Sequence, residues 1–130
     1  MVPNKRIDEM SLPQIRRLVA LHILGWVQKA DSKNVLWYTA PGGDPDKSDR
    51  TLCAYWDEYR DNDNLYIVTD KMVSLGWDYS LEYRDYQKEY SAIFHKEAIL
   101  GSAKSRESMQ DAVFIAAISA INYKERKVTT

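Results

Sequence analysis

The stretch SRESMQDAVFIAAISAIN, residues Ser105–Asn122, decides which fold this chain can adopt. Ser105 can accept a hydrogen bond from an amide of a first helical turn, so we expect it to be the N-cap. Apolar side chains then recur at spacings of three and four residues, which predicts one continuous helix. Four alanines between positions 112 and 120 leave one side of this helix nearly flat. A sheet or a second helix can approach such a side closely, and we expect other elements to pack there.

The composition is that of a single globular domain. The chain has 130 residues, of which 45% are hydrophobic and 28% charged, with a formal net charge of -1. This length suits one domain, and the hydrophobic content is too high for a disordered chain. The near-zero net charge argues against non-specific binding of duplex DNA, which we do not expect. We expect a flexible N-terminus over residues 1–10, a single domain over 11–122 and a charged tail over 123–130.

Cysteine content and hydropathy point to a reducing compartment. Cys53 is the only cysteine, so no internal disulfide and no cysteine-based zinc site can form. The first ten residues lack the apolar core of a signal peptide, and no apolar run is long enough to span a membrane. We therefore expect a cytoplasmic protein without membrane segments.

The first half of the chain predicts one long helix followed by irregular structure. Ser11 is a good N-cap, and apolar residues mark one face of a helix from Leu12 to Val27. Arg16 and Arg17 lie mostly off that face, and Gly25 is placed inside the helix. Beyond it, Val35–Tyr38 (VLWY) forms either a short strand or an apolar loop anchor. Residues 41–46 are rich in turn-forming proline and glycine. Residues 51–59 are ambiguous between helix and irregular structure.

The second half predicts a helix and then three strands. Leu65, Val68, Met72 and Leu75 form one apolar stripe, and Gly76 is suited to end that helix. Polar and apolar residues then alternate over 79–84 and 90–95, and a third strand follows over 98–103, with Gly101 as a candidate bulge. The expected fold class is α+β, a three-stranded antiparallel meander sheet with about three helices packed against it.

Three segments resemble the phage ABA sandwich domain family. They are IRRLVALHILGW (residues 15–26), VTDKMVSLGW (residues 68–77) and AKSRESMQDAVFIAAISAI (residues 103–121). The sequence departs from the family pattern between Asp31 and Asn64, where it is longer and richer in aromatic residues. The resemblance implies a three-stranded antiparallel sheet covered by helices and an origin in a phage or prophage, hence the cytoplasm of a bacterial host. It implies no established catalytic residues.

No motif of catalysis or metal binding is present in the sequence. Asp44 and Asp46 begin like a calcium-binding loop, but the required glycine and glutamate are missing from the later positions. His22 and His95 are the only histidines and form no HExxH pair. Cys53 has no histidine nearby in sequence, which favours a buried free thiol over a nucleophile. We therefore expect no enzyme, no cofactor and no metal site.

Aromatic and arginine residues concentrate in the irregular region and form the candidate binding site. The candidate ligand-binding residues are Trp37, Tyr38, Arg50, Tyr55, Trp56, Tyr59 and Arg60. Aromatic faces stack on bases and guanidinium groups pair with phosphates, so the set suits a small nucleotide. The same residue types also anchor protein interfaces, and they equally serve as core.

Two functional hypotheses follow from these residues. The first is a non-enzymatic phage accessory protein that binds and sequesters a small nucleotide-type ligand, such as a cyclic nucleotide signal of bacterial defence. The alternative is a homo-oligomeric protein-interaction module that modulates a host or phage protein. A homo-oligomer is expected in either case, and a bacterial protein is a candidate partner.

Overall fold

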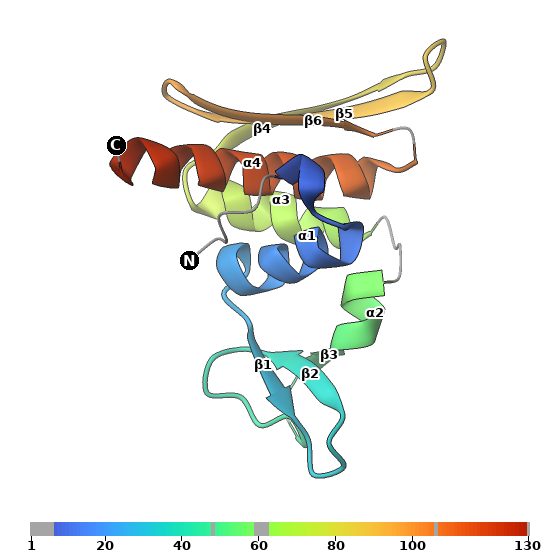
Figure 1. The fold of residues 1–130 in the computed structure, drawn as a ribbon, viewed down its shortest axis with the longest axis vertical. Coiled ribbons are helices and arrows are strands. Elements are labelled where there is room, and N and C mark those ends of the chain that lie inside the picture. Colours follow the sequence, from blue (N-terminus) through green and yellow to red (C-terminus); the bar gives the residue numbers. More distant parts are fainter. Residues whose placement is uncertain (1–6, 48, 59–62, 106, 130) are drawn as a thin grey trace.

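The computed structural model describes residues 7–47, 49–58, 63–105 and 107–129, and their side chains except at position 8 and from 122 onward. Its elements run in the order η1 (Ile7–Glu9), α1 (Leu12–Leu18), η2 (Val19–Ile23), β1 (Val27–Ala30), β2 (Leu36–Thr39), β3 (Arg50–Leu52), α2 (Cys53–Glu58), α3 (Asn64–Ser74), β4 (Asp78–Arg84), β5 (Glu89–Lys96), β6 (Ile99–Ser105) and α4 (Met109–Thr129). The α+β class expected from the sequence is confirmed. Figure 1 shows the larger sheet at one end of the long axis, the helices in the middle and a smaller sheet at the other end.

The larger sheet is the predicted antiparallel meander, with strand order β4-β5-β6. Helix α4 runs along one face of this sheet (Figure 1). Gly101 pairs with Phe94 within an unbroken register, so the bulge considered at Gly101 is not there. Its role is steric instead. A Cβ at Gly101 would lie 2.3 Å from the backbone nitrogen of Ala120, so the missing side chain lets α4 approach β6 this closely.

Helix α4 begins later than the sequence predicted. Ser105 still belongs to β6, and its hydroxyl accepts hydrogen bonds from the backbone amides of Glu107 and Ser108. Ser108 is the residue that caps the helix, because its hydroxyl accepts from the amide of Asp111 at 3.1 Å. The helix also continues past Asn122 to Thr129. The expected N-cap at Ser105 is therefore wrong by three residues.

The first helix is shorter than predicted. Ser11 caps α1 with a capping box to Gln14, as expected, but the α-helix ends at Leu18 and passes into the π-helical turn η2. Gly25 has a φ of 74° and lies after the helix, where a residue without a side chain readily adopts this conformation. No atom lies within 4 Å of a Cβ placed there, so Gly25 serves a change of direction, not close packing.

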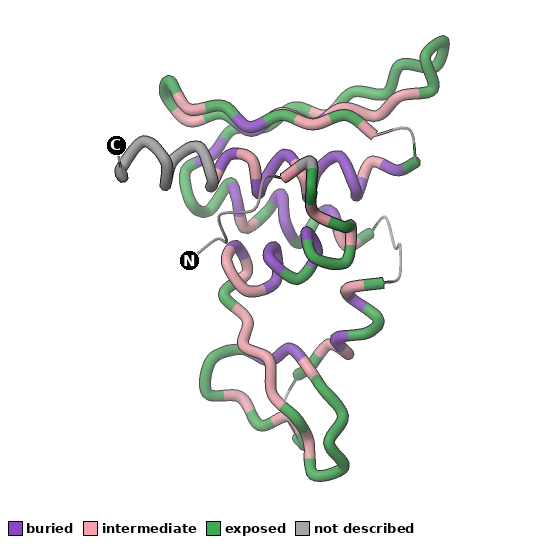
Figure 2. The backbone as a smooth tube through the Cα atoms, viewed as in Figure 1, coloured by how far each residue is buried: buried purple, intermediate pink, exposed green. Residues whose placement is uncertain are grey.

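A second sheet, of strand order β1-β2-β3, was not predicted from the sequence. Strand β2 confirms the strand alternative considered for residues 35–38, with Tyr38 paired to Gln28 on one side and Thr51 on the other. The ambiguous segment that follows resolves into β3 and the short helix α2. This small sheet is mostly exposed or half-buried, as the green and pink tube in Figure 2 shows.

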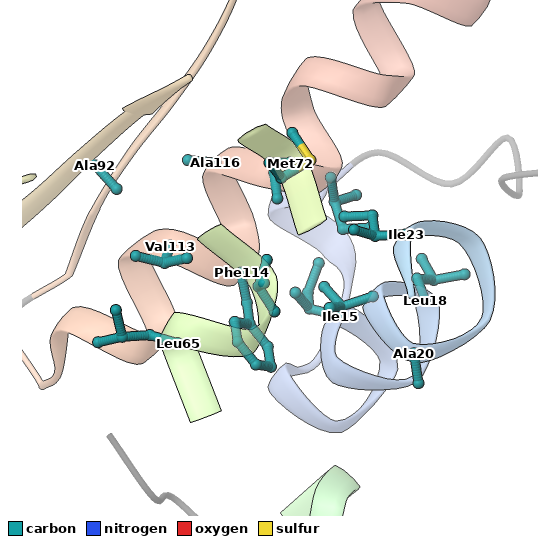
Figure 3. Packing of buried hydrophobic residues seen from close by; sticks show 14 of the residues in the cluster. Ile15, Leu18, Ala20, Ile23, Leu65, Met72, Ala92, Val113, Phe114 and Ala116 are labelled. Atoms are coloured by element: carbon teal, nitrogen blue, oxygen red, sulfur yellow. The ribbon is translucent and has the colours of Figure 1, made fainter. Parts of the chain in front are cut away.

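The core has two parts, one between the larger sheet and α4 and one between α4 and the other helices. Figure 3 shows Ile15 and Ile23 of the first helical segment, Met72 of α3 and Phe114 of α4 converging between the helices. The alanines of α4 at positions 112, 116, 117 and 120 are fully buried, as the flat side of the helix predicted. Helix α3 ends at Ser74 with Leu75 as its C-cap, and the φ of 96° at Gly76 confirms the predicted C′ glycine that stops the helix.

Candidate functional site

The sequence-predicted ligand residues fall on two neighbouring elements. Trp37 and Tyr38 lie on β2 and Arg50 on β3, whereas Tyr55 and Trp56 lie on α2. Tyr59 and Arg60 lie outside the described residues. Trp37 and Tyr38 point to opposite faces of the small sheet, because they are successive residues of one strand, and the strand register places Arg50 on the face of Trp37.

Trp37 and Arg50 bind each other. The guanidinium carbon of Arg50 lies 3.8 Å from the centre of the Trp37 ring, a cation–π contact. Asp31 fixes both side chains, since its carboxylate accepts from the indole N–H of Trp37 at 3.0 Å and lies 3.9 Å from Arg50. Arg50 also donates to the backbone carbonyl of Pro45. These contacts hold the guanidinium of Arg50 in one position, over the ring of Trp37.

Asp31 is the organising acceptor of this loop. Its carboxylate also accepts from the backbone amides of Lys33 and Val35, at 2.8 and 2.9 Å. The hydrogen bond from Trp37, followed by the backbone bonds, lowers the pKa of Asp31 below its ordinary value. The carboxylate therefore stays ionised at neutral pH and keeps a negative charge beside Arg50.

Trp56 is part of the core. Only 2% of its surface is exposed, and its indole N–H donates to the backbone carbonyl of Arg16 at 2.7 Å. Its ring stacks on Phe114 at 5.5 Å and meets the edge of Trp26 at 5.0 Å. Protein neighbours occupy both sides of the Trp56 ring, so the structure assigns it to packing and leaves it no open face for a ligand. Tyr55 on the same helix is partly exposed.

Tyr38 connects the small sheet to a polar cluster on α2. Its hydroxyl donates to Asp57 Oδ1 at 2.7 Å, and Gln28 Nε2 lies 3.7 Å from the sulfur of Cys53. Burial, with the hydrogen bond to Asp57, raises the pKa of Tyr38 above its ordinary range. Burial also raises the pKa of the Asp57 carboxyl and of the Cys53 thiol. A protonated, buried thiol is a poor nucleophile, and the phenol is held as a hydrogen-bond donor.

A pocket of about 390 Å³ opens on the same sheet. It is lined by Trp26, Tyr38, Thr39, Ala40, Asp49, Arg50 and Thr51. Its volume lies within the range of small-molecule sites. Of the residues proposed from the sequence, Tyr38 and Arg50 line this pocket, and Trp37, Tyr55 and Trp56 do not.

The remaining lining residues were not proposed from the sequence. Trp26 was assigned to the core of the first helix, but the turn at Gly25 carries it out to the base of β1. Thr39 and Thr51 are ordinary strand residues, and Asp49 precedes β3. Gly25 itself was the one sequence signal that Trp26 leaves the helix, because glycine favours the positive φ that ends helices.

The described part of the chain has neither a metal-binding cluster nor a membrane-spanning helix. It holds no group of three or more His, Cys, Asp or Glu side chains arranged to bind a metal ion. Its helices are also too short or too polar to cross a lipid bilayer.

The comparisons with known proteins identify a similar fold. No protein-family model matches this chain, and no curated protein matches it. Among solved structures, the chain is similar to a phage protein from Bacillus cereus ATCC 14579, with a TM-score of 0.59 and 16% sequence identity. The match covers 92% of this chain and 97% of that one, so the likeness is one of overall fold.

Proposed function

We propose that this chain is a non-enzymatic accessory protein of a phage or prophage that binds a small nucleotide-type ligand in the pocket on its small sheet. Its setting would be the cytoplasm of the bacterial host. The fold shared with a Bacillus cereus phage protein supports the phage origin, as does the resemblance to the phage ABA sandwich domain. The pocket lined by Trp26 and Arg50 is the observation that carries the ligand proposal.

The pocket offers the three kinds of contact that a nucleotide needs. Trp26 supplies an aromatic ring for a base. Arg50 supplies a guanidinium for a phosphate, held in place by Trp37 and Asp31 before any ligand arrives. Asp49 and the hydroxyl of Thr51 match the hydroxyls of a ribose.

The polar cluster beside the pocket supports binding without catalysis. Cys53 is buried and its pKa is raised, which disfavours the thiolate. The Tyr38 hydroxyl donates to Asp57, and burial raises the pKa of this phenol further above its ordinary value. These groups are suited to hold the sheet against α2, and we propose no reaction for them.

The test is a binding screen with purified protein. Thermal shift and calorimetry would use nucleoside monophosphates, 3′,5′-cyclic and cyclic dinucleotides and ADP-ribose. We expect at least one of these compounds to bind and to be released intact when the protein is denatured. Its affinity for the Arg50→Gln and Trp26→Ala variants should be lower than for wild type by roughly tenfold or more. Tyr86→Ser is the matched control, because Tyr86 is 82% exposed in the turn between β4 and β5, far from the small sheet. If no nucleotide in the panel binds, the proposal is wrong.

A second candidate function rests on the exposed apolar face of α3. Tyr66 and Val73 are 59% and 51% exposed, and Ile67 is 44% exposed on the same helix. Large apolar residues grouped on one exposed face are typical of protein interfaces. This favours a protein-interaction module acting on a host or phage protein. A bacterial protein that co-purifies stoichiometrically, and is lost in Tyr66→Ser/Val73→Ser, would favour this function over the first.

A further inference from the structure

Strand β4 is an edge strand that its own chain leaves largely uncovered. It lies at one end of the order β4-β5-β6. Every residue of β4 except Leu81 is exposed, whereas its neighbour β5 buries Ala92 and Phe94 completely. The cause is the position of α4, which packs mainly on β6 and β5. The helix therefore leaves the matching face of β4 open.

Two tyrosines occupy that open face. Tyr79 and Tyr83 are 39% and 46% exposed, although they share a sheet face with the buried Phe94. Each is the outer member of an aromatic pair, with Tyr79 at 5.9 Å from Phe94 and Tyr83 at 4.6 Å from Tyr90. Each pair ends at the sheet edge. An edge strand also leaves the N–H and C=O groups of alternate residues unpaired by the sheet, which is a template for another strand.

The sequence of β4, DYSLEYR, is complementary to itself in the antiparallel direction. When the strand is paired with a second copy about Leu81, Asp78 faces Arg84 of the partner subunit, and Tyr79 faces Tyr83 of the partner subunit. Leu81 then faces its own equivalent. Opposite charges and aromatic pairs placed directly across an antiparallel ladder both stabilise it. The strand is seven residues long and contains no proline, glycine or bulge to interrupt pairing.

We propose that two copies of this chain associate through their β4 edges, antiparallel and centred on Leu81, so that the two larger sheets become one continuous sheet. The interface is isologous, as a two-fold dimer requires. It extends both aromatic pairs across the boundary, since Tyr79, already against Phe94, then meets Tyr83 of the partner subunit. The opposite edge, β6, is less suited, because its one charged residue, Lys104, would face no acidic residue of β6 in a second copy.

This proposal is independent of the ligand pocket. The pocket is on the small sheet, at the other end of the molecule (Figure 1). The dimer leaves that pocket open, so either proposal can fail without the other.

Charge reversal tests both the interface and its register. Asp78→Arg places two arginines opposite each other, and Arg84→Asp places two aspartates opposite each other. Both positions are exposed, so the fold should tolerate either change. We expect wild type to dimerise in sedimentation equilibrium, and each variant alone to lose roughly tenfold or more in association constant. An equimolar mixture of the two variants restores both opposite-charge pairs and should form a heterodimer.

Lys104→Glu is the matched control. It reverses a charge on the other edge strand at a side chain that is 65% exposed, and the association constant should stay at the wild-type value. The proposal is overturned if wild type remains monomeric across the concentration range. It is equally overturned if the two variants fail to associate on mixing, or if Lys104→Glu weakens association as much as the β4 variants do.

Discussion

Arg16 donates a hydrogen bond to Asp111 across the core, with 2.9 Å between Nη2 and Oδ1, although the two residues are 95 positions apart. Both side chains are almost completely buried, at 4% and 2% exposed. Arg16 also donates to the backbone carbonyl of Asp57, and its own carbonyl accepts from Trp56. One residue of α1 thereby joins α4 to α2 and, through α2, to the small sheet.

Removing one partner of this ion pair should be costly. Arg16→Met leaves a buried carboxylate at Asp111, and we expect a loss of about 3–5 kcal/mol in the free energy of unfolding, measured by urea titration. Arg17→Met is the control, since Arg17 is exposed and the loss should stay within about 0.5 kcal/mol. The double variant Arg16→Met/Asp111→Leu should lose less than the two single variants added together. Equal losses for the Arg16 and Arg17 variants would show that the pair contributes nothing.

A methyl group at Gly101 should disrupt the packing of α4 on β6. The added Cβ would lie 2.3 to 2.6 Å from backbone atoms of Ala116 and Ala120, which cannot move without displacing the helix. We expect Gly101→Ala to lower the free energy of unfolding by about 3 kcal/mol. Ser102→Ala, at an exposed neighbouring position of the same strand, should change it by less than about 0.5 kcal/mol. If Gly101→Ala leaves the free energy of unfolding unchanged, then α4 does not approach β6 as closely as these distances imply.

The sequence predicted the larger sheet and its covering helix because their signals extend over many residues. Alternation over residues 79–84 and 90–95 marks β4 and β5, and the alanines of α4 identify the side that the sheet covers. The small sheet was missed because its strands are three and four residues long. Alternation cannot be recognised over so few positions.

Arg16 was placed off the apolar face, and this was wrong. Hydrophobic periodicity assigns every charged residue to solvent, and the acidic partner of Arg16 lies on a helix at the other end of the sequence. The same limit applies to the candidate site. The aromatic and arginine content pointed to this region, but no sequence pattern shows that Tyr38 and Arg50 line one pocket or that Trp56 packs in the core.

Asp31 should make the stability of the small sheet depend on pH. Its pKa is lowered in the folded chain, so its ionised form stabilises the fold above the ordinary value of 3.8. That contribution is lost as pH falls from this value through the lowered pKa. Asp31→Asn lacks the charge at every pH. We expect the variant to be less stable than wild type at neutral pH and the difference to shrink below about pH 3.8, measured by denaturant titration across pH. A difference that is constant across pH would contradict the role given to Asp31.

Cys53 should be unreactive in the folded protein. Only 5% of its surface is exposed, and burial raises the pKa of its thiol, with the charge of Asp57 acting in the same direction. Thiol reagents attack the thiolate, so both effects slow the reaction at neutral pH. We expect Ellman's reagent to modify native protein at least roughly a hundred times more slowly than protein unfolded in urea at the same pH. Because the chain has one cysteine, mass spectrometry reads a single labelled site. Equal rates in the two states would mean that the contact between α2 and the small sheet opens freely, and the pocket beside it would then not be pre-formed.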